Sequence, residues 1–240
     1  MLLQAALNGP FTRTDHAAVP LSVEELVADS VACVAAGAGA VHLHPRDEAG
    51  NEQLRPDVVD GVASAVREAC GVPVGVSTGA WIEPDMRRRL ELIRGWRAPD
   101  YASVNVSEEG SFEVMRVLLD GAIGVEAGVW SVEDAERLAA SGMADTVTRI
   151  LIEPVNVGAA AAVAAVERIH AVLDRLLDSA PRLQHGDGEA TWVLLSDAVA
   201  RGIDTRIGLE DTLFEPDGRR TTGNAALVSR ASQLGAGVLR

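Results

Sequence analysis

Two histidines in the sequence, His42 and His44, are spaced so that they could act together. They lie in a short apolar run, residues 40–46, and alternate residues of a β-strand point to the same face. Two imidazoles about 6–7 Å apart on one strand face can converge on a single ion. A His-x-His pair alone is more often a packing or surface feature, so a metal site requires a further ligand from elsewhere in the chain.

The acidic pair Glu210-Asp211, which ends the apolar run 204–211, is a candidate source of that ligand, although it could also be a solvated strand end or a cap for the following turn. Arg206 lies on the same strand face as Glu210, and an arginine buried there needs a carboxylate or a substrate anion to balance its charge. One carboxylate of the pair can bind the metal while the other acts as a base. We therefore expect His42, His44 and Glu210 to hold a divalent cation with coordination positions left open for catalysis.

The elements that must position these residues alternate along the chain between short apolar runs and longer helical patterns, which is typical of βα units on a parallel sheet. We expect strands over residues 3–9, 40–46, 73–79, 101–106, 123–129, 148–154, 182–188 and 204–211. We expect helices near residues 22–36, 56–70, 84–95, 111–121, 131–141, 158–178, 189–202 and 222–235. Ser22-x-x-Glu25 matches a capping box, and Pro56 and Pro84 occupy first-turn positions. Eight βα units in 240 residues predict an α/β fold, a (β/α)₈ TIM barrel with residues 1–240 as its single domain.

In such a barrel the functional residues collect at the carboxyl ends of the strands. The sequence places polar side chains there: Asn8, His42, His44, Arg46, Ser77, Thr78, Ser103, Asn105, Glu126, Glu153, His185, Glu210 and Asp211. A purely structural interior would favour Val, Ile and Leu at these positions. His185 could either orient a substrate or bind a loop carbonyl.

Three further features carry weaker signals. Gly186-Asp187-Gly188 follows a predicted strand and precedes a helix, where barrels often bind phosphate. The run Met86-Arg87-Arg88-Arg89 is interpreted as a solvated helix face, with contact to an anionic cofactor tail as the less favoured alternative. His16 and His170 are interpreted as packing or surface residues.

The composition excludes several classes of partner. With 35 acidic and 21 basic residues the net charge is −14, which opposes binding to nucleic acid and to anionic membrane surfaces. No run of 18 apolar residues occurs, and the first residues lack a secretory leader pattern. Cys33 and Cys70 have neither metal-ligand spacing nor the number that a disulfide framework needs, so they indicate thiols in a reducing compartment. We expect a cytoplasmic protein that binds neither nucleic acid nor membranes.

Seven segments of the chain together resemble the β-keto acid cleavage enzymes, whose founding activity is 3-keto-5-aminohexanoate cleavage. The most specific are His42-Leu43-His44-Pro45-Arg46-Asp47, within the matching stretch 37–47, and Arg206-Ile207-Gly208-Leu209-Glu210-Asp211. The others are residues 6–9, 76–79, 102–105, 125–126 and 224–228, so that the resemblance covers essentially the whole chain.

The resemblance implies a zinc-dependent barrel, assembled as a homo-oligomer (a dimer or tetramer), that cleaves a 3-oxo acid with acetyl-CoA and forms acetoacetate and a new acyl-CoA by a retro-Claisen type of reaction. It implies Zn²⁺ at His42, His44 and Glu210. Asp211 is similar to the general base of the family, and Arg206 to its orienting partner. The positions that resemble substrate contacts or lie beside them are Asn8, Ser77, Thr78, Ser103, Asn105, Glu126 and His185, with Glu126 at the variable end of the substrate.

Two features set this chain apart from the family pattern. It is short, so loops around the substrate pocket or the CoA entrance are trimmed. Phe11 places an apolar ring where a polar contact would serve an amino-bearing substrate, which predicts a 3-oxo acid other than the amino-hexanoate type.

Two alternative functions use the same ligands. One is another metal-dependent barrel enzyme that does not use CoA, such as a lyase, a class II-type aldolase or an amidohydrolase-like hydrolase; Glu126 and Glu153 stand where an amidohydrolase would carry histidines. The other is a non-catalytic metal-binding barrel, which would need neither Asp211 nor Arg206.

Overall fold

The computed structural model describes residues 1–177 and 180–237 and contains a closed barrel of eight parallel strands in the order β1 to β8. The strands are β1 Leu3–Ala6, β2 Ala40–Leu43, β3 Val74–Ser77, β4 Tyr101–Asn105, β5 Gly124–Val129, β6 Arg149–Ile152, β7 Arg182–Gln184 and β8 Asp204–Ile207. The predicted (β/α)₈ barrel is confirmed.

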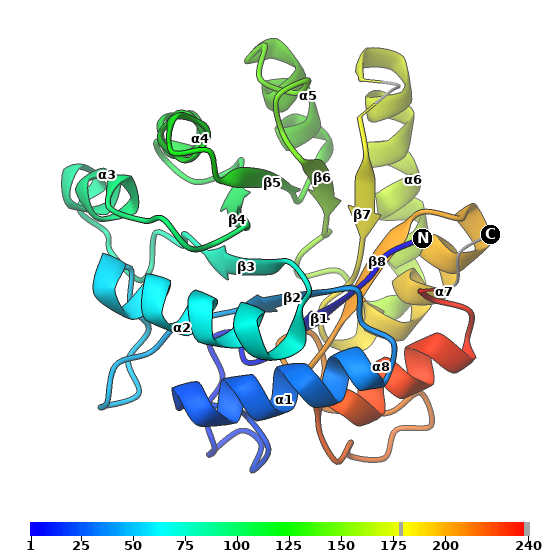
Figure 1. Ribbon diagram of the computed structural model, residues 1–240. Coiled ribbons are helices and arrows are strands. Elements are labelled where there is room, and N and C mark those ends of the chain that lie inside the picture. Colours follow the sequence, from blue (N-terminus) through cyan, green and yellow to red (C-terminus); the bar gives the residue numbers. More distant parts are fainter. Residues whose placement is uncertain (178–179, 238–240) are drawn as a thin grey trace.

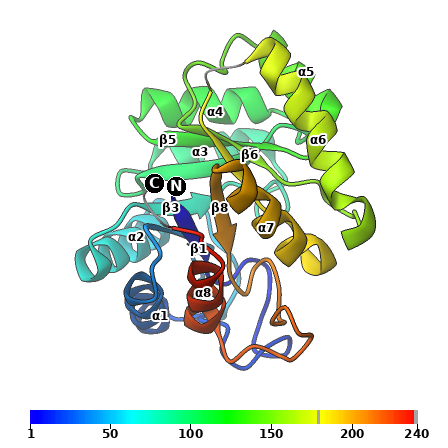
Figure 2. The same ribbon diagram turned by 90° about the vertical axis from the view of Figure 1, so that its right-hand side faces the viewer.

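Each strand is followed by a helix on the outside of the barrel, as Figures 1 and 2 show. The helices are α1 Val23–Ala35, α2 Pro56–Cys70, α3 Met86–Arg94, α4 Ser111–Asp120, α5 Val132–Ala140, α6 Ala159–Leu176, α7 Thr191–Arg201 and α8 Asn224–Gln233. A 3₁₀ turn, Gly188–Ala190, precedes α7. Residue 178, the expected end of the sixth helix, lies outside the described residues.

Local capping explains where two of the helices begin. Ser22 and Glu25 form the predicted capping box at the start of α1. The prediction that Pro84 lies in the first turn of α3 is wrong: Asp85 is the N-cap, and its carboxylate accepts hydrogen bonds from the backbone N–H groups of Arg87 and Arg88. α3 therefore begins at Met86.

Most of the strands end earlier than the apolar runs predict, and beyond β1 a side chain continues the pairing. β1 ends at Ala6, yet Asn8 Oδ1 accepts from the His44 N–H at 2.9 Å and Asn8 Nδ2 donates to the His44 carbonyl at 3.0 Å. The Asn8 amide thus continues the β1–β2 pairing beyond the last strand residues. Asn8 holds the backbone of a candidate metal ligand in place.

A polar network fills part of the barrel interior. Gln4 Nε2 donates to the Tyr101 hydroxyl and to Glu126 Oε1, each at 2.9 Å, and Arg149 Nε lies 3.2 Å from Glu126 Oε1. Glu126 has no exposed surface, and its burial raises the pKa of its carboxyl group. Burying an unpaired polar group costs free energy, and these contacts offset that cost. They explain why Glu126 can lie in the barrel interior.

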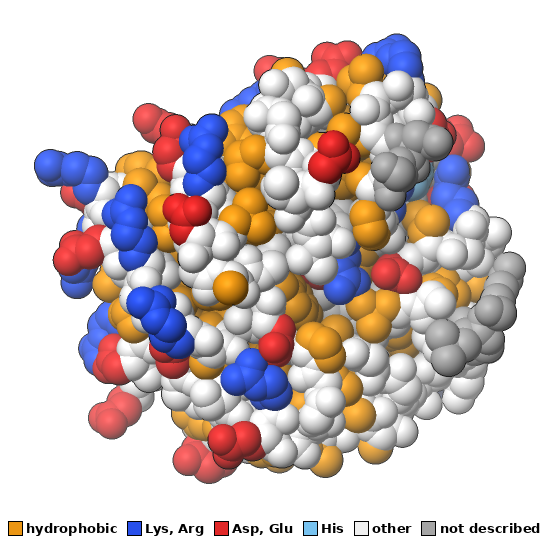
Figure 3. All heavy atoms as spheres, turned by 45° about the horizontal axis from the view of Figure 1, so that its top comes forward, with side chains coloured by type: hydrophobic (Ala, Val, Ile, Leu, Met, Phe, Trp, Pro, Cys, Tyr) orange, Lys and Arg blue, Asp and Glu red, His pale blue; other side chains and the backbone are white. Residues whose placement is uncertain are grey.

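The outer surface carries no large region of one charge in the view of Figure 3, where acidic and arginine side chains are interspersed. In the described ranges 1–177 and 180–237, no helix has the length and apolar character needed to cross a membrane. Cys33 is buried in α1 and Cys70 is partly buried at the end of α2; both are free thiols.

Candidate functional site

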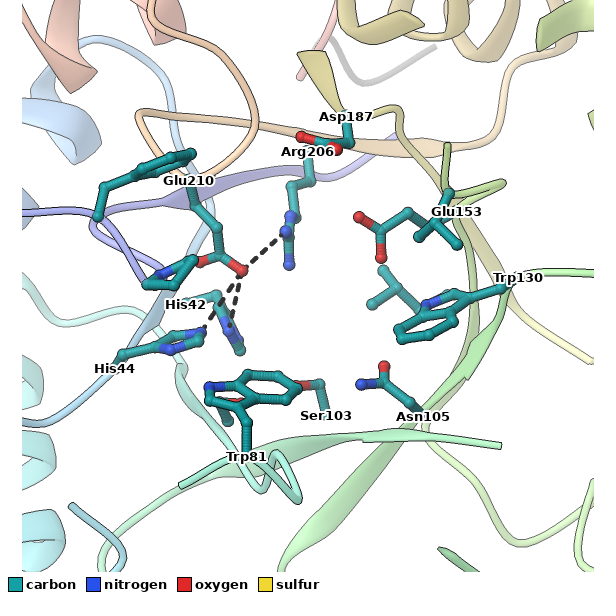
Figure 4. A pocket seen from close by; sticks show the side chains of 15 residues that line it. His42, His44, Trp81, Ser103, Asn105, Trp130, Glu153, Asp187, Arg206 and Glu210 are labelled. Carbon is teal, nitrogen blue, oxygen red and sulfur yellow. Dashed lines mark hydrogen bonds and ion pairs between the residues drawn. The ribbon is translucent and has the colours of Figure 1, made fainter. Parts of the chain in front are cut away.

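His42, His44 and Glu210 converge at the carboxyl end of the barrel (Figure 4). Glu210 Oε1 lies 3.7 Å from His42 Nε2 and 3.5 Å from His44 Nε2, and the three candidate ligand atoms all lie within 4.8 Å of one another. His42 is the third residue of β2, His44 follows the end of that strand, and Glu210 lies in the turn after β8. Barrel closure brings these distant segments together, because β1 pairs with both β2 and β8.

The backbone at Gly9 leaves room for Glu210. Gly9 has a φ of 50°, and a Cβ atom there would lie 2.5 Å from Glu210 Cγ. Only glycine adopts such a backbone without strain while allowing this approach. The Arg46 guanidinium fixes the same loop, since it donates to the carbonyls of Gly9 and Phe11 at 2.7 and 3.0 Å.

Glu52 and Trp81 support His44 from the side away from Glu210. Glu52 Oε1 contacts His44 Nδ1, and Trp81 Nε1 donates to Glu52 Oε2 at 3.2 Å. The Trp81 ring stacks on His44 with 6.3 Å between centroids. A carboxylate at the second ring nitrogen is the usual partner of a metal-binding histidine, because it fixes the tautomer that leaves Nε2 free.

The electrostatics of the cluster favour a cation. Burial lowers the pKa of His42 to about 3, which keeps its imidazole neutral. Burial acts in the same direction at His44, but the carboxylates of Glu210 and Glu52 outweigh it and raise its pKa to about 9. Although burial opposes ionisation of Glu210, Arg206 and the two histidines hold the pKa of its carboxyl group well below the usual range.

The donor set suits a divalent metal ion. The Nε2 atoms of His42 and His44 both face Glu210 Oε1, and in the described structure Glu210 Oε2 is buried without a hydrogen-bond partner. Two imidazole nitrogens and one carboxylate oxygen, with further positions open to water or substrate, are the ligands of a catalytic zinc site. The residues present therefore fit the group that the sequence predicts.

Arg206 and Asp211 form a buried ion pair beside this cluster. Arg206 Nη2 donates to Asp211 Oδ1 at 2.7 Å and to Glu210 Oε1 at 3.0 Å. Arg206 faces a cavity, whereas Asp211 is 2% exposed and is absent from the described residues that line that cavity. Asp211 thus lies behind Arg206. Its assignment as general base stays a prediction.

The cavity encloses about 400 Å³ and is lined by the candidate metal-ligand cluster, Arg206 and three predicted substrate contacts, Ser77, Ser103 and Asn105. Four more predicted residues are not among the described lining residues: Asn8, Thr78, Glu126 and His185. The Thr78 hydroxyl instead donates to the Ser103 carbonyl at 2.7 Å. The substrate roles of these four residues stay predictions.

Sequence reasoning missed the aromatic and apolar walls of the cavity. Trp81, Trp130, Leu151 and Val155 line it together with Phe11. Trp81 and Val155 come from loops, and Trp130 directly follows β5, so these three had no strand pattern that marks a site residue. Leu151 lies inside β6, where an apolar residue does not distinguish a cavity wall from the barrel interior. Asp187, from the predicted Gly-Asp-Gly segment, also lines the cavity, and burial raises the pKa of its carboxyl group.

The remaining histidines lie elsewhere. His16 Nε2 is 3.0 Å from the Thr221 carbonyl, and His170 Nε2 is 2.8 Å from Gln184 Oε1. Both are packed between elements, which confirms their interpretation as packing residues.

Comparison with known proteins identifies relatives over the whole chain. The 3-keto-5-aminohexanoate cleavage enzyme of Acetoanaerobium sticklandii is 23% identical over 254 residues, which cover 98% of this chain and 91% of the relative. The protein of the same name from Fusobacterium nucleatum is 24% identical over 250 residues, covering 98% of this chain and 90% of the relative.

Among solved structures, the apo form of ObcA has a TM-score of 0.71 at 17% identity, covering 92% of this chain. The ternary complex of ObcA with a C4-CoA adduct and oxalate has a TM-score of 0.70 at 17% identity, covering 90% of this chain. The chain spans 63% of the length of ObcA in both, just under two thirds. At this identity the likeness shows a shared fold.

The family model described as beta-keto acid cleavage enzyme matches residues 1–239, so almost every position, including the cluster at His42, His44 and Glu210, falls within it. The chain therefore belongs to the beta-keto acid cleavage enzyme family.

Proposed function

We propose that this protein cleaves a 3-oxo acid with acetyl-CoA, forming acetoacetate and a new acyl-CoA, and that it does so with zinc held by His42, His44 and Glu210. The observation that carries the proposal is the convergence of these three side chains within 4.8 Å at one end of a cavity that also contains Arg206. The buried guanidinium of Arg206 can bind a carboxylate, and a metal ion beside it can bind a second oxygen. The pair therefore suits a substrate that carries both groups.

Each group at the cavity has a proposed task. When bound, zinc would supply Lewis acidity toward the oxygens of the 3-oxo acid. Arg206 binds a carboxylate or a developing oxyanion, and Asp211 holds the guanidinium in place through the 2.7 Å hydrogen bond. Ser77, Ser103 and Asn105 offer hydrogen bonds to the substrate from β3 and β4.

The comparisons support this reaction class. The curated relatives are named 3-keto-5-aminohexanoate cleavage enzymes, and the structurally similar ObcA has been solved with a C4-CoA adduct. The name of the curated relatives concerns cleavage of a β-keto acid, and the ObcA complex contains a CoA adduct. The reaction proposed for this chain combines these two kinds of chemistry.

The substrate is proposed to differ from the amino-hexanoate type. Phe11, Trp81, Trp130, Leu151 and Val155 give the cavity apolar walls, which favour the carbon chain of a 3-oxo acid. A panel of 3-oxo acids assayed with acetyl-CoA tests this point; a strong preference for the amino substrate would refute it.

Metal analysis and product analysis of the purified protein test the proposal together. We expect about one zinc per chain, as a single three-ligand site requires, and acetoacetate formed in step with a new acyl-CoA. His44→Asn should lose both zinc and turnover, whereas the matched His16→Asn, which lies outside the cluster and the cavity lining, should keep both. Bound zinc without acetoacetate from any member of the panel would reject the CoA reaction in favour of a barrel enzyme that does not use CoA.

We also propose a cytoplasmic homo-oligomer, a dimer or tetramer, as the family resemblance implies. Light scattering on the purified protein gives the mass in solution, and a mass near the 25.2 kDa of one chain would reject assembly.

A further inference from the structure

Asn224 begins α8 with a buried side chain to which the function proposed above assigns no task. Its side chain is 1% exposed. Its Oδ1 accepts from the Leu209 N–H at 2.6 Å, and its Nδ2 donates to the Leu7 carbonyl at 2.8 Å and to Asp29 Oδ2 at 2.6 Å. One amide therefore joins the segment after β1, the segment after β8 and helix α1.

The packing of α1 and α8 allows this amide to reach both strand ends. Figure 2 shows the two helices side by side, next to β1 and β8. β1 and β8 are paired, with Ala5 opposite Ile207. Gly208 brings their ends closer still, because a Cβ atom there would lie 1.8 Å from the Ala6 carbonyl oxygen. Asn224 thus bridges two backbones that already lie against each other.

The segment after β1 holds the backbone of both candidate histidine ligands. The Leu7 N–H donates to the His42 carbonyl at 2.9 Å. The Asn8 side chain binds both the N–H and the carbonyl of His44. The carbonyl of the same Leu7 is one of the groups that Asn224 binds. A shift of this segment would therefore move the backbone of His42 and His44 as well.

The segment after β8 holds the third candidate ligand. Leu209, whose N–H donates to Asn224, directly precedes Glu210, and the Glu210 N–H donates to the Ala6 carbonyl at 3.3 Å. The Leu209 hydrogen bond, at 2.6 Å, is the shorter of the two and restrains this turn more strongly. The separation of Glu210 from the imidazole nitrogens therefore depends on how Asn224 spaces the two segments.

Asp29 determines which way the Asn224 amide is turned. Burial raises the pKa of Asp29 to about 6, so its carboxylate is ionised at neutral pH. An ionised carboxylate only accepts hydrogen bonds, so it requires the Nδ2 donor. The reversed amide would place an oxygen against Asp29 and the Leu7 carbonyl, and an NH₂ group against the Leu209 N–H. Asp29 thus keeps the Asn224 acceptor directed at the turn that carries Glu210.

We propose that Asn224 is a positioning residue of the metal site, that it sets the spacing between Glu210 and the two histidines, and that Asp29 fixes its orientation. This assignment rests on the zinc site of the proposed function. Asn224 is not among the described residues that line the cavity, so it acts through the backbone of Leu7 and Leu209. Groups that hold metal ligands in place change metal affinity by about 10- to 100-fold when they are lost.

Asn224→Asp tests the role of the two donors. The substitution keeps the size and shape of the side chain and the acceptor for Leu209, but it replaces Nδ2 with an oxygen that repels Asp29. We expect the zinc Kd, measured at neutral pH by competition with a chromophoric chelator, to rise by about 10- to 100-fold. Co²⁺ bound in place of zinc should show a changed visible spectrum, because the spectrum reports the geometry of the ligands.

Gln184→Glu is the matched control. Gln184 is also a buried amide, and its Nε2 donates to the Leu194 carbonyl and to Asp197 Oδ2, each at 2.9 Å. These contacts join β7 to α7 and include none of the candidate metal ligands. The control should lose stability to denaturant yet keep the wild-type zinc Kd and Co²⁺ spectrum. A role in stability alone would make Asn224→Asp behave in the same way.

Exchange of the two side chains gives a rescue experiment. In Asn224→Asp combined with Asp29→Asn, the carboxamide at position 29 can donate to the carboxylate at position 224. The double variant should therefore recover part of the zinc affinity that Asn224→Asp loses. Asp29→Leu removes the acceptor while Asn224 is kept, and it should raise the zinc Kd by a smaller factor. This variant decides the question where Asn224→Asp does not fold.

The outcomes separate this proposal from the proposed function. A wild-type zinc Kd and Co²⁺ spectrum in Asn224→Asp, or an equal rise of the Kd in Gln184→Glu, overturns the positioning role and leaves the zinc site standing. A double variant that binds zinc no better than Asn224→Asp overturns the part assigned to Asp29. A raised Kd in Asn224→Asp, with no acetoacetate from the wild type, overturns the CoA reaction and supports the role of Asn224. A wild-type protein that binds no zinc overturns both.

Discussion

Glu52→Gln tests whether the support behind His44 tunes the metal site. Glu52 contacts His44 Nδ1 and accepts from Trp81 Nε1 at 3.2 Å, so the substitution removes the negative charge while glutamine can still accept from the indole. Loss of a carboxylate partner behind a metal-binding histidine weakens metal affinity by about 10- to 100-fold, or about 1.4–2.7 kcal/mol. We expect the zinc Kd to rise by this factor.

Competition with a chromophoric chelator at fixed pH measures the zinc Kd directly and does not depend on turnover. Glu48→Gln, an exposed carboxylate in the same loop, is the matched control and should leave the zinc Kd unchanged. Trp81→Phe keeps a ring against His44 but removes the N–H donor to Glu52, so it should have a smaller effect than Glu52→Gln. An identical zinc Kd for Glu52→Gln and the wild type would refute the idea that Glu52 orients His44.

Three further predictions follow from individual contacts. Asp211→Asn removes a negative partner 2.7 Å from buried Arg206. It should lower the free energy of unfolding by about 3 kcal/mol and lower turnover by about 100-fold or more, with zinc retained. Unfolding by denaturant and the acetoacetate assay measure these effects, and full activity would contradict the prediction. Burial raises the pKa of Asp29 to about 6, so ionising it costs stability as pH rises from about 4 to about 6, and the cost is complete above pH 6. Asp29→Asn should therefore gain about 2–3 kcal/mol relative to the wild type between pH 4 and pH 7, and a difference that does not vary with pH would argue against it. Gly9→Ala should lower the free energy of unfolding by about 1–2 kcal/mol, the cost of a left-handed backbone at alanine, and weaken zinc binding because its Cβ displaces Glu210; an unaltered zinc Kd would show that Glu210 adjusts freely.

The number and order of the elements follow from local patterns in the sequence. Short apolar runs, which are typical of buried strands, alternate with longer segments whose apolar residues recur at the helical period. Eight strands and eight helices could therefore be counted without a structure. The ends of the strands were less predictable. The apolar run 3–9 continues past Ala6, where β1 ends. At Asn8 the side chain, and not the backbone, pairs with His44, and the sequence pattern does not distinguish these two kinds of pairing.

The central part of the candidate site was also predictable. His42 and His44 are two residues apart on one strand, and Glu210 and Arg206 flank the end of another. The rule that functional residues gather at the carboxyl ends of barrel strands was sufficient to place them together. No local pattern could have found Glu52 or Trp81, because loop conformations bring them to His44.

What the tertiary structure alone decided is which polar residues reach the cavity. Glu126 and Glu153 both lie at or near strand ends in the sequence. The register of β5 with its neighbours buries Glu126 against Gln4 and Arg149, whereas Glu153 emerges beyond β6 into the cavity. Asp211 follows the candidate metal ligand Glu210 in the chain but turns behind Arg206. Side-chain alternation along a strand determines only inward or outward direction; the stagger and closure of the barrel determine the depth at which each inward side chain lies.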